Sequence, residues 1–317
     1  MKLVLGLLTV LVFSLGHAQQ FPARTVHIVV PYTPGTGADL LARLIGPRLA
    51  ERWKVAVVTE NKPGATGNIG ADLVAKSAPD GHTILFVATS FGTTPALAKN
   101  LPFDPVKSFE PVALVATSGL VVLVNPQLAV HSLKELIELA RREPGQLHYS
   151  SPGNGGPQHL AMELLKLETG VNIVHVPYKG AAGALADLVG GHVQATIAAV
   201  QTAHPHVLSG KARAVGVMSV ERSQAFPDVP TLKEQGFPDL DVETWYAAFV
   251  PAGTPAATVS RINTDLNAVL GESAIRALLE QQGMTPRGGP PERLGELVKR
   301  ELARWRRVVD AAGIKAD

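Results

Sequence analysis

The chain has 317 residues, of which 46% are hydrophobic, 18% charged and 5% aromatic, with a formal net charge of +2 and no cysteine. The lack of cysteine excludes disulfides, thiolate nucleophiles and Cys-ligated metals. The near-neutral charge, without a long basic run, argues against nucleic acid as a partner, and the low aromatic fraction argues against a stacking platform for sugars or bases.

The first eighteen residues have the pattern of a secretory signal. Met1 and Lys2 give a charged start, an apolar run follows over 3–15, and residues 16–18 form a small-residue cleavage site before Gln19. The apolar run is too short to span a bilayer comfortably. We therefore expect cleavage and a periplasmic location, with a retained N-terminal anchor as the alternative.

The first half of the remaining chain alternates strands with helices. Strands are predicted at 26–31, 55–60, 83–88, 111–116 and 120–125. Helices are predicted at 38–52 and 68–76. A β-α-β-α-β order implies a parallel sheet with right-handed crossovers.

A second series begins at Asn125 and Pro126. Ser132 is expected to cap a helix over 133–142. Further strands are predicted at 148–151, 173–176, 193–198, 212–218 and 244–251. Further helices are predicted at 158–167, 182–189, 256–270, 273–281 and 291–312.

The second series predicts a domain inserted into the first. The chain crosses near 122–125 and returns near 245–250, and two crossings make a hinge. We expect a signal peptide at 1–18, a first domain of 19–124 plus 246–317, and a second domain of 125–245. A single large doubly wound sheet is the alternative.

A strand–Gly loop–helix unit occurs twice, over 26–45 and 147–167. Such a loop directs backbone N–H groups and the positive end of a helix dipole at one point. The first copy has neither the spacing of a dinucleotide fingerprint nor that of a P-loop. Two such loops facing each other would clamp an anion, which favours a binder of carboxylates over an enzyme.

Several polar residues near these loops allow two interpretations. Asp39 is expected to complement the dipole of its helix more than to contact a ligand. Thr66 and Asn68 could equally cap the following helix or donate to a ligand. Ser90 follows the third strand, and the carboxyl ends of strands in open α/β sheets face the binding crevice.

Three histidines are candidates for a chemical role. His159 lies in the first turn of its helix and is expected to be structural or ligand-orienting more than catalytic. His204 and His206, on a segment expected to be extended, could ligate a metal, but no third ligand is apparent. No cofactor or metal is expected.

These segments together resemble the solute-binding receptors of tripartite tricarboxylate transporters, the Bug/TctC-type family. The similar blocks run in order along the whole mature chain. They include IVVPYTPGTGADLLAR (28–43), ENKPGATGNIGADLVAKSAPDGHTIL (60–85), LPFDPVKSFEPVALVA (101–116), YSSPGNGGPQHLA (149–161), VHVPYKGAAGALADLVGGHV (174–193), FPDVPTLKEQGFP (226–238), PAGTP (251–255) and the closing AGIKAD (312–317).

The resemblance implies an α/β fold of the two-domain periplasmic binding protein type (type II-like), with parallel-rich sheets flanked by helices and a ligand cleft between the domains. It implies a small organic acid as ligand, a membrane permease as partner and no catalytic residues. We also expect a monomer. The implied contacts are Tyr32, Thr33, Gly35, Thr36, Gly37, Thr66, Gly67, Asn68 and Ser90 in the first domain, and Ser151, Gly153, Asn154, Gly155, Gly156 and His159 in the second.

Three departures from the family pattern matter. Thr36 stands where the family loop usually has a second glycine, and Gly156 stands where a hydroxyl residue is usual. Ala198 aligns with a frequent aspartate that could pair with a ligand ammonium, so amino-acid ligands are less expected. Gln201 offers a neutral polar contact instead.

We therefore expect a periplasmic receptor for a di- or tricarboxylate or an aromatic carboxylate. One alternative is a secreted hydrolase or transferase that uses His159 with Ser151 or Ser90. Another is a sensor that passes its ligand state to a membrane signalling protein.

Overall fold

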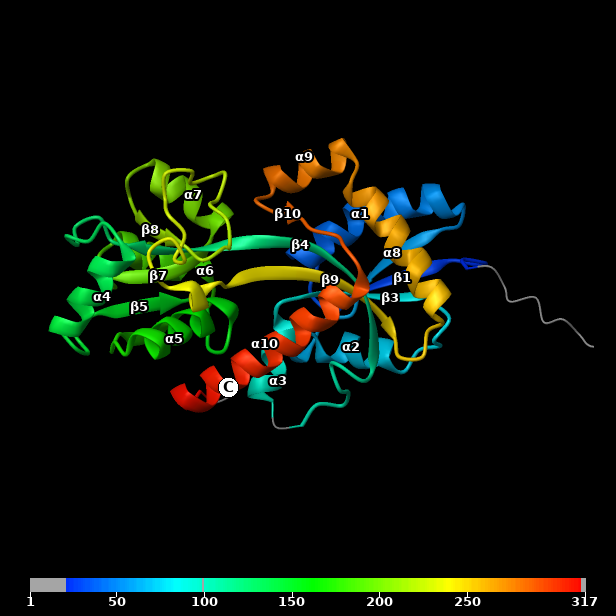
Figure 1. Ribbon diagram of the computed structural model, residues 1–317, viewed down its shortest axis with the longest axis horizontal. Helices are drawn as coiled ribbons and strands as arrows, with labels where there is room; N and C mark the ends of the chain where they lie inside the picture. The colour runs from blue at the N-terminus through cyan, green and yellow to red at the C-terminus, as the bar shows by residue number, and fades with distance from the viewer. Residues whose placement is uncertain (1–20, 99, 315–317) are drawn as a thin grey trace, which may run out of the picture.

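The computed structural model describes residues 21–98 and 100–314, which form two lobes joined by two long strands and one helix (Figure 1). The signal sequence predicted at residues 1–18 lies outside the described residues. Among the helices of the described ranges, none is long and apolar enough to cross a membrane.

Lobe one is built on a mixed sheet. Its parallel strands are β1 (Val26–Val30), β2 (Val57–Asn61) and β3 (Thr83–Ala88), and β3 pairs antiparallel with β9 (Glu243–Pro251). The parallel sheet expected from the β-α-β-α-β order is confirmed for β1, β2 and β3, and β9 joins it in the antiparallel sense. The helices of this lobe are α1 (Gly37–Trp53), α2 (Asn68–Ala75), α3 (Ser90–Leu97), α8 (Ala256–Leu270) and α9 (Ser273–Gln281), with a 3-10 turn at Ala65–Gly67.

The helices of lobe one form because their apolar residues recur at helical spacing. On α1, Leu41, Ile45 and Leu49 follow one another at four-residue intervals and are buried against the sheet. They join one core with α8, while Phe91, Phe103 and other residues form a second core. The sheet of lobe one is thus covered on both faces.

Lobe two repeats this arrangement around the parallel strands β5 (His148–Ser151), β6 (Val174–Pro177) and β7 (Ala195–Ala199). Its other elements are α4 (Leu133–Arg142), α5 (Pro157–Thr169), α6 (Ala181–Val189), α7 (Val200–Leu208), β8 (Arg213–Val217) and a 3-10 turn at Pro238–Leu240. Ser132 caps α4 as predicted, since its Oγ accepts a hydrogen bond from the Glu135 N–H at 3.2 Å.

One strand, β4 (Phe109–Val124), replaces the two strands predicted at 111–116 and 120–125. It pairs with β9 up to Gly119 and with β7 from Leu120 onward, so the chain passes from lobe one to lobe two without a turn. Two register shifts interrupt the β9 pairing between Pro111 and Ala116, whereas the residues between the two predicted strands pair regularly with β9. The domain boundaries given above remain a prediction.

The third connection between the lobes is α10 (Pro291–Ala312), which the two-crossing scheme did not include. Leu294 and Val298, in its first half, pack in the lobe-one core with Phe249. Trp305 and Val308, in its second half, pack in the lobe-two core. The helix runs diagonally across both lobes (Figure 1), so any change in the angle between the lobes must also involve α10.

Two short helices were not predicted, and each contains a proline. Pro95 lies inside α3 and Pro205 inside α7. Each lies beyond the first turn, where the ring removes one helical hydrogen bond but does not stop a short helix held by its neighbours. The segment with His204 and His206 is therefore helical, not extended. The short strand β10 (Thr285–Pro286), which pairs with β4, was also not predicted.

Candidate functional site

The parallel strands of each lobe end at an edge directed toward the other lobe. Ala116 on β4 aligns through Tyr246 with Ala88, the last residue of β3. Leu120 on β4 aligns with Ala199, the last residue of β7, which runs in the opposite sense. Along β4, the edge of lobe one and the edge of lobe two are thus four residues apart, about 13 Å. The two edges lie on opposite sides of β4 in the strand order.

Loop one, residues 32–37, joins β1 to α1. Gly35 adopts a φ of +84°, a left-handed conformation that favours glycine. Its N–H donates to Asp39 Oδ2 at 2.9 Å, and Thr36 Oγ1 donates to the Thr33 carbonyl at 3.0 Å. Thr36 is the N-cap residue of α1, and its side chain makes no capping bond. The first turn of α1 therefore helps to fix the conformation of loop one through Asp39.

Asp39 is the buried anchor of loop one, with 2% of its surface exposed. Its carboxylate accepts from the Arg43 guanidinium at 3.0 Å and from Asn61 Nδ2 at 2.8 Å. Burial works to raise the pKa of Asp39, but the hydrogen bonds from Arg43, the Gly35 N–H and Asn61 outweigh it, and the pKa lies below its usual range. The sequence predicted that Asp39 lies in the first helical turn, but not that it accepts a hydrogen bond from loop one.

Two tyrosines lie beside loop one. The Tyr32 hydroxyl is 2.7 Å from Ser90 Oγ and accepts from the Ala88 N–H at 3.1 Å. The structure therefore brings together the predicted residues Tyr32 and Ser90. On β9, Tyr246 lies against the first residue of α1, where a Cβ on Gly37 would come within 2.7 Å of the ring carbon that bears the hydroxyl.

The loop over 64–68 reaches Tyr32 through a strained turn. Ala65 and Thr66 have φ values of +46° and +56°, which non-glycine residues rarely adopt. Gly67, at φ +99°, could not carry a Cβ without bringing it to 3.0 Å from the Tyr32 ring. Neither Thr66 nor Asn68 caps α2, because its N-cap residue is Gly67 and no side chain makes a capping bond there.

Loop two, residues 151–156, joins β5 to α5. Gly155 has a φ of +66°, and its N–H donates to His159 Nδ1 at 2.9 Å. Gly156 is the N-cap residue of α5 and Pro157 its first helical residue. His159 is 4% exposed, so it lies beneath the loop.

Beneath loop two, His159 stacks on His175 of β6. Their ring centroids are 3.9 Å apart and their planes differ by 12°. His175 Nε2 lies 2.7 Å from Ser151 Oγ, which also donates to the Gly153 carbonyl at 3.0 Å. The serine expected to pair with His159 in the hydrolase alternative is therefore paired with His175, and Ser90 is paired with Tyr32.

Helix α3 connects the two loop regions. It begins at Ser90, and a Cβ on Gly155 would lie 2.5 Å from a methyl group of Leu97, the last residue of α3. Eight helical residues span about 10 Å. Loop two of one lobe therefore packs on a short helix whose other end lies in the site region of the other lobe.

The remaining predicted residues are placed as follows. Gln201 lies at a different junction of the lobes, where its Oε1 accepts from Ser118 Oγ at 2.9 Å, and Ser118 also donates to the Gly283 carbonyl at 3.0 Å. Asn154 lies within loop two. For metal binding, no group of three or more His, Asp or Glu side chains suited to an ion is found among residues 21–98 and 100–314.

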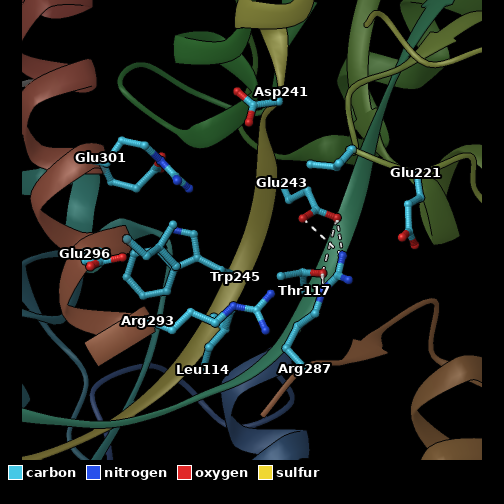
Figure 2. A pocket seen from close by; sticks show the side chains of 13 residues that line it. Leu114, Thr117, Glu221, Asp241, Glu243, Trp245, Arg287, Arg293, Glu296 and Glu301 are labelled. Carbon is cyan, nitrogen blue, oxygen red and sulfur yellow. Dashed lines mark hydrogen bonds and ion pairs between the residues drawn. The ribbon is translucent and has the colours of Figure 1, made fainter. Parts of the chain in front are cut away.

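A cavity of about 400 Å³ lies between α10 and the connecting strands. Figure 2 shows Arg287 from the segment after β10 directed toward Glu243 of β9, and the two form an ion pair at 3.1 Å. Arg287 Nε also donates to Thr117 Oγ1 at 2.8 Å. This network ties β10 to both connecting strands at the point where they cross between the lobes.

Sequence reasoning missed three residues of this region: Tyr246, His175 and Leu97. Tyr246 lies in a segment that was predicted as a strand. The alternation of side chains along that strand could have shown which face of the sheet Tyr246 lies on, but not that it contacts α1. Burial raises the pKa of the Tyr246 hydroxyl, and the neighbouring Tyr32 adds to that rise. His175 lies within a quoted motif, yet nothing in the spacing links it to Ser151.

Comparison with known proteins adds independent findings. A family model described as "Tripartite tricarboxylate transporter family receptor" matches residues 41–314. Protein BugT of Bordetella pertussis is 35% identical over 300 residues, covering 94% of this chain and 92% of that protein.

Two solved structures from Rhodopseudomonas palustris are also similar. Rpa4515, solved with adipate, is 36% identical with a TM-score of 0.75, covering 93% of this chain and 99% of that one. MatC, solved with bound malate, is 33% identical with a TM-score of 0.72, covering 91% of this chain and 100% of that one.

Proposed function

Because the chain belongs to the tripartite tricarboxylate transporter receptor family, we propose that it is a periplasmic receptor that captures a small di- or tricarboxylate or an aromatic carboxylate. The adipate and malate bound by two similar proteins support a dicarboxylate in particular. The fold expected from the sequence, two α/β lobes of the periplasmic binding protein type, is confirmed by the similar structures.

The observation that carries the proposal is the pair of uncapped helix starts in the two loops. Neither α1 nor α5 begins with a side-chain capping bond, so the positive end of each helix dipole faces its loop and attracts an anion. Arg43, which lies on α1 beyond loop one, is already bound to Asp39. The ligand carboxylate is therefore held by peptide dipoles and hydroxyls.

This mode of binding is strong enough for a receptor. A hydrogen bond to a charged group contributes about 1.5–3 kcal/mol. Four or five such bonds support a micromolar Kd, about −8 kcal/mol, after the costs of association. An arginine–carboxylate pair buried in the site would release its cargo less readily.

We further propose that the protein is not an enzyme. Ser151 and His175 form a hydrogen-bonded pair, but the pair lies under loop two, where Ser151 also donates to the backbone. Both imidazoles are held by stacking, which serves positioning more than proton transfer. A membrane permease of the tripartite type is the proposed partner, with the receptor acting as a monomer after cleavage of residues 1–18.

Thermal unfolding against an organic-acid panel tests the function. The panel contains dicarboxylates of graded length, including malate and adipate, with citrate, benzoate and phthalate isomers. A ligand at 100 times its Kd should stabilise the protein by about 2.7 kcal/mol. Adipamide, the uncharged diamide of adipate, is the matched control and should have no effect. No stabilisation by any carboxylate in the panel would refute the proposal.

A further inference from the structure

We propose that His175 is a positioning residue for carboxylate binding, which holds loop two in its binding shape through Ser151 and through the stacked ring of His159. This inference rests on the proposed function for its ligand. The evidence is a continuous set of contacts from β6 to the backbone of loop two.

The first set of contacts runs through Ser151 at the start of loop two. His175 Nε2 lies 2.7 Å from Ser151 Oγ, and Oγ lies 3.0 Å from the Gly153 carbonyl. If the Nε2–H of His175 donates to Oγ, the hydroxyl proton remains for the Gly153 carbonyl, and every contact is satisfied. His175 thereby fixes the hydroxyl that bends the loop back on itself.

The second set of contacts runs through His159 at the end of loop two. A backbone N–H can only donate, so the bond from Gly155 requires an unprotonated Nδ1 on His159. His175 holds that ring by stacking at 3.9 Å. Protonation of His159 at Nδ1 would replace an acceptor with a second donor and break the bond.

The groups around His159 and His175 disfavour a positive charge on the two rings. The Tyr149 ring of β5 also stacks on His175, with ring centroids 4.8 Å apart, and Glu163 and Lys166 of α5 are paired at 2.7 Å. Burial, and then the neighbouring His159, lower the pKa of His175 to about 4, with Glu163 opposing and Lys166 adding to that shift. His175 is thus neutral at the pH of the periplasm and gains a proton only in acid.

The experiment measures Kd for adipate and malate by calorimetry in wild type, His175→Ala, His175→Gln and His175→Phe. His175→Ala should weaken binding about tenfold or more. Gln can reach Ser151 from the position of Nε2, and Phe can keep the stack, so each should recover part of the affinity. His192→Ala changes an exposed histidine of the same lobe and should stay within twofold of wild type.

A pH series separates positioning from a merely structural role. The ratio of Kd for His175→Ala to Kd for wild type should shrink as the pH falls from 7 to 4. A proton on His175 Nδ1 leaves the bond to Ser151 but places a charge in the ring stack with His159, which weakens the wild type. The ratio cancels the titration of the ligand itself. A folded His175→Ala variant with a wild-type Kd, or a ratio that does not change with pH, would overturn the proposal.

Hydrogen exchange on the ligand-free protein keeps this test separate from the proposed function. Peptides covering residues 150–158 should exchange faster in His175→Ala than in wild type, and His175→Gln serves if the alanine variant does not fold. Faster exchange in a protein that binds no carboxylate would refute the receptor function and leave the positioning of the loop supported. Unchanged exchange would refute the positioning whatever the ligand.

Discussion

Loop one and loop two have the same backbone arrangement, but the side chain that accepts a hydrogen bond from the loop glycine differs in its chemistry. In each, a glycine with positive φ donates its N–H to the side chain four residues later, Gly35 to Asp39 and Gly155 to His159, both at 2.9 Å. The N-cap residues also match, with φ −72° in both and ψ 159° at Thr36 and 163° at Gly156. The acceptor is a carboxylate in one loop and a neutral imidazole in the other.

The difference shows how a carboxylate can lie beneath a loop that is proposed to bind carboxylates. Asp39 needs Arg43 and Asn61 to neutralise and satisfy it, and those partners come from the next helical turn and from β2. His159 carries no charge while it accepts from Gly155, so loop two needs no compensating cation. We therefore expect the two loops to respond differently to substitution and to acid.

The largest expected effect comes from Asp39→Ala. Removing the carboxylate leaves the Gly35 N–H and Asn61 without their acceptor, which should lower the free energy of unfolding by about 2–3 kcal/mol. Urea unfolding measures this loss. Asp39→Asn retains an oxygen for Gly35 and should lose roughly half as much. Equal losses in the two variants would mean that charge, and not the bond to loop one, carries the effect.

A second test compares two glycines at the helix starts, Gly37, the first residue of α1, and Gly156, the N-cap residue of α5. A Cβ on Gly37 would meet the Tyr246 ring, whereas a Cβ on Gly156 would have its nearest neighbour at 3.8 Å. Gly37→Ala should therefore cost about 1–3 kcal/mol of unfolding free energy, and Gly156→Ala no more than about 0.5 kcal/mol. Urea unfolding of both variants measures the two losses of unfolding free energy. Similar losses would contradict the contact with Tyr246.

As the pH falls, lobe two should lose stability before loop one does. An unfolded histidine titrates near about 6.5, and His175 in the folded protein near about 4, so the unfolded state binds the extra proton between these values. Stability from His175 is complete above about pH 6.5 and falls toward pH 4, by about 1–2 kcal/mol after allowance for partial exposure. Asp39, with its lowered pKa, loses its contribution only below about pH 4.

Urea unfolding of wild type and His175→Gln at pH 7, 5.5 and 4.5 checks the sign of this dependence. The difference in unfolding free energy between the two proteins should narrow as the pH falls, because the wild type alone carries the histidine. Parallel curves for the two proteins would show that other groups cause the loss.

The smallest expected effect comes from Thr36→Gly, which gives loop one the second glycine that is usual in the family. Thr36 makes no capping bond, and its hydroxyl donates only to the exposed Thr33 carbonyl. The substitution should cost about 0.5 kcal/mol or less in unfolding free energy. A loss well above 1 kcal/mol in urea unfolding would show that Thr36 shapes loop one.

Local patterns were sufficient to predict most of the elements. The helices at 133–142, 256–270, 273–281 and 291–312 and the strands at 83–88 and 148–151 have the bounds that the structure gives them. The two glycine loops also follow from the chain, because small residues between a strand and a helix are a local signal. The family resemblance is confirmed by the comparisons.

The tertiary structure alone decided which side chains meet. Ser151 pairs with His175, 24 residues away, and Tyr246 reaches Gly37 from a strand more than 200 residues later in the chain. The path of α10 across both cores and the continuity of β4 also depend on partners distant in sequence. Periodicity reports which face of an element is apolar, whereas strand register and helix packing determine what that face touches.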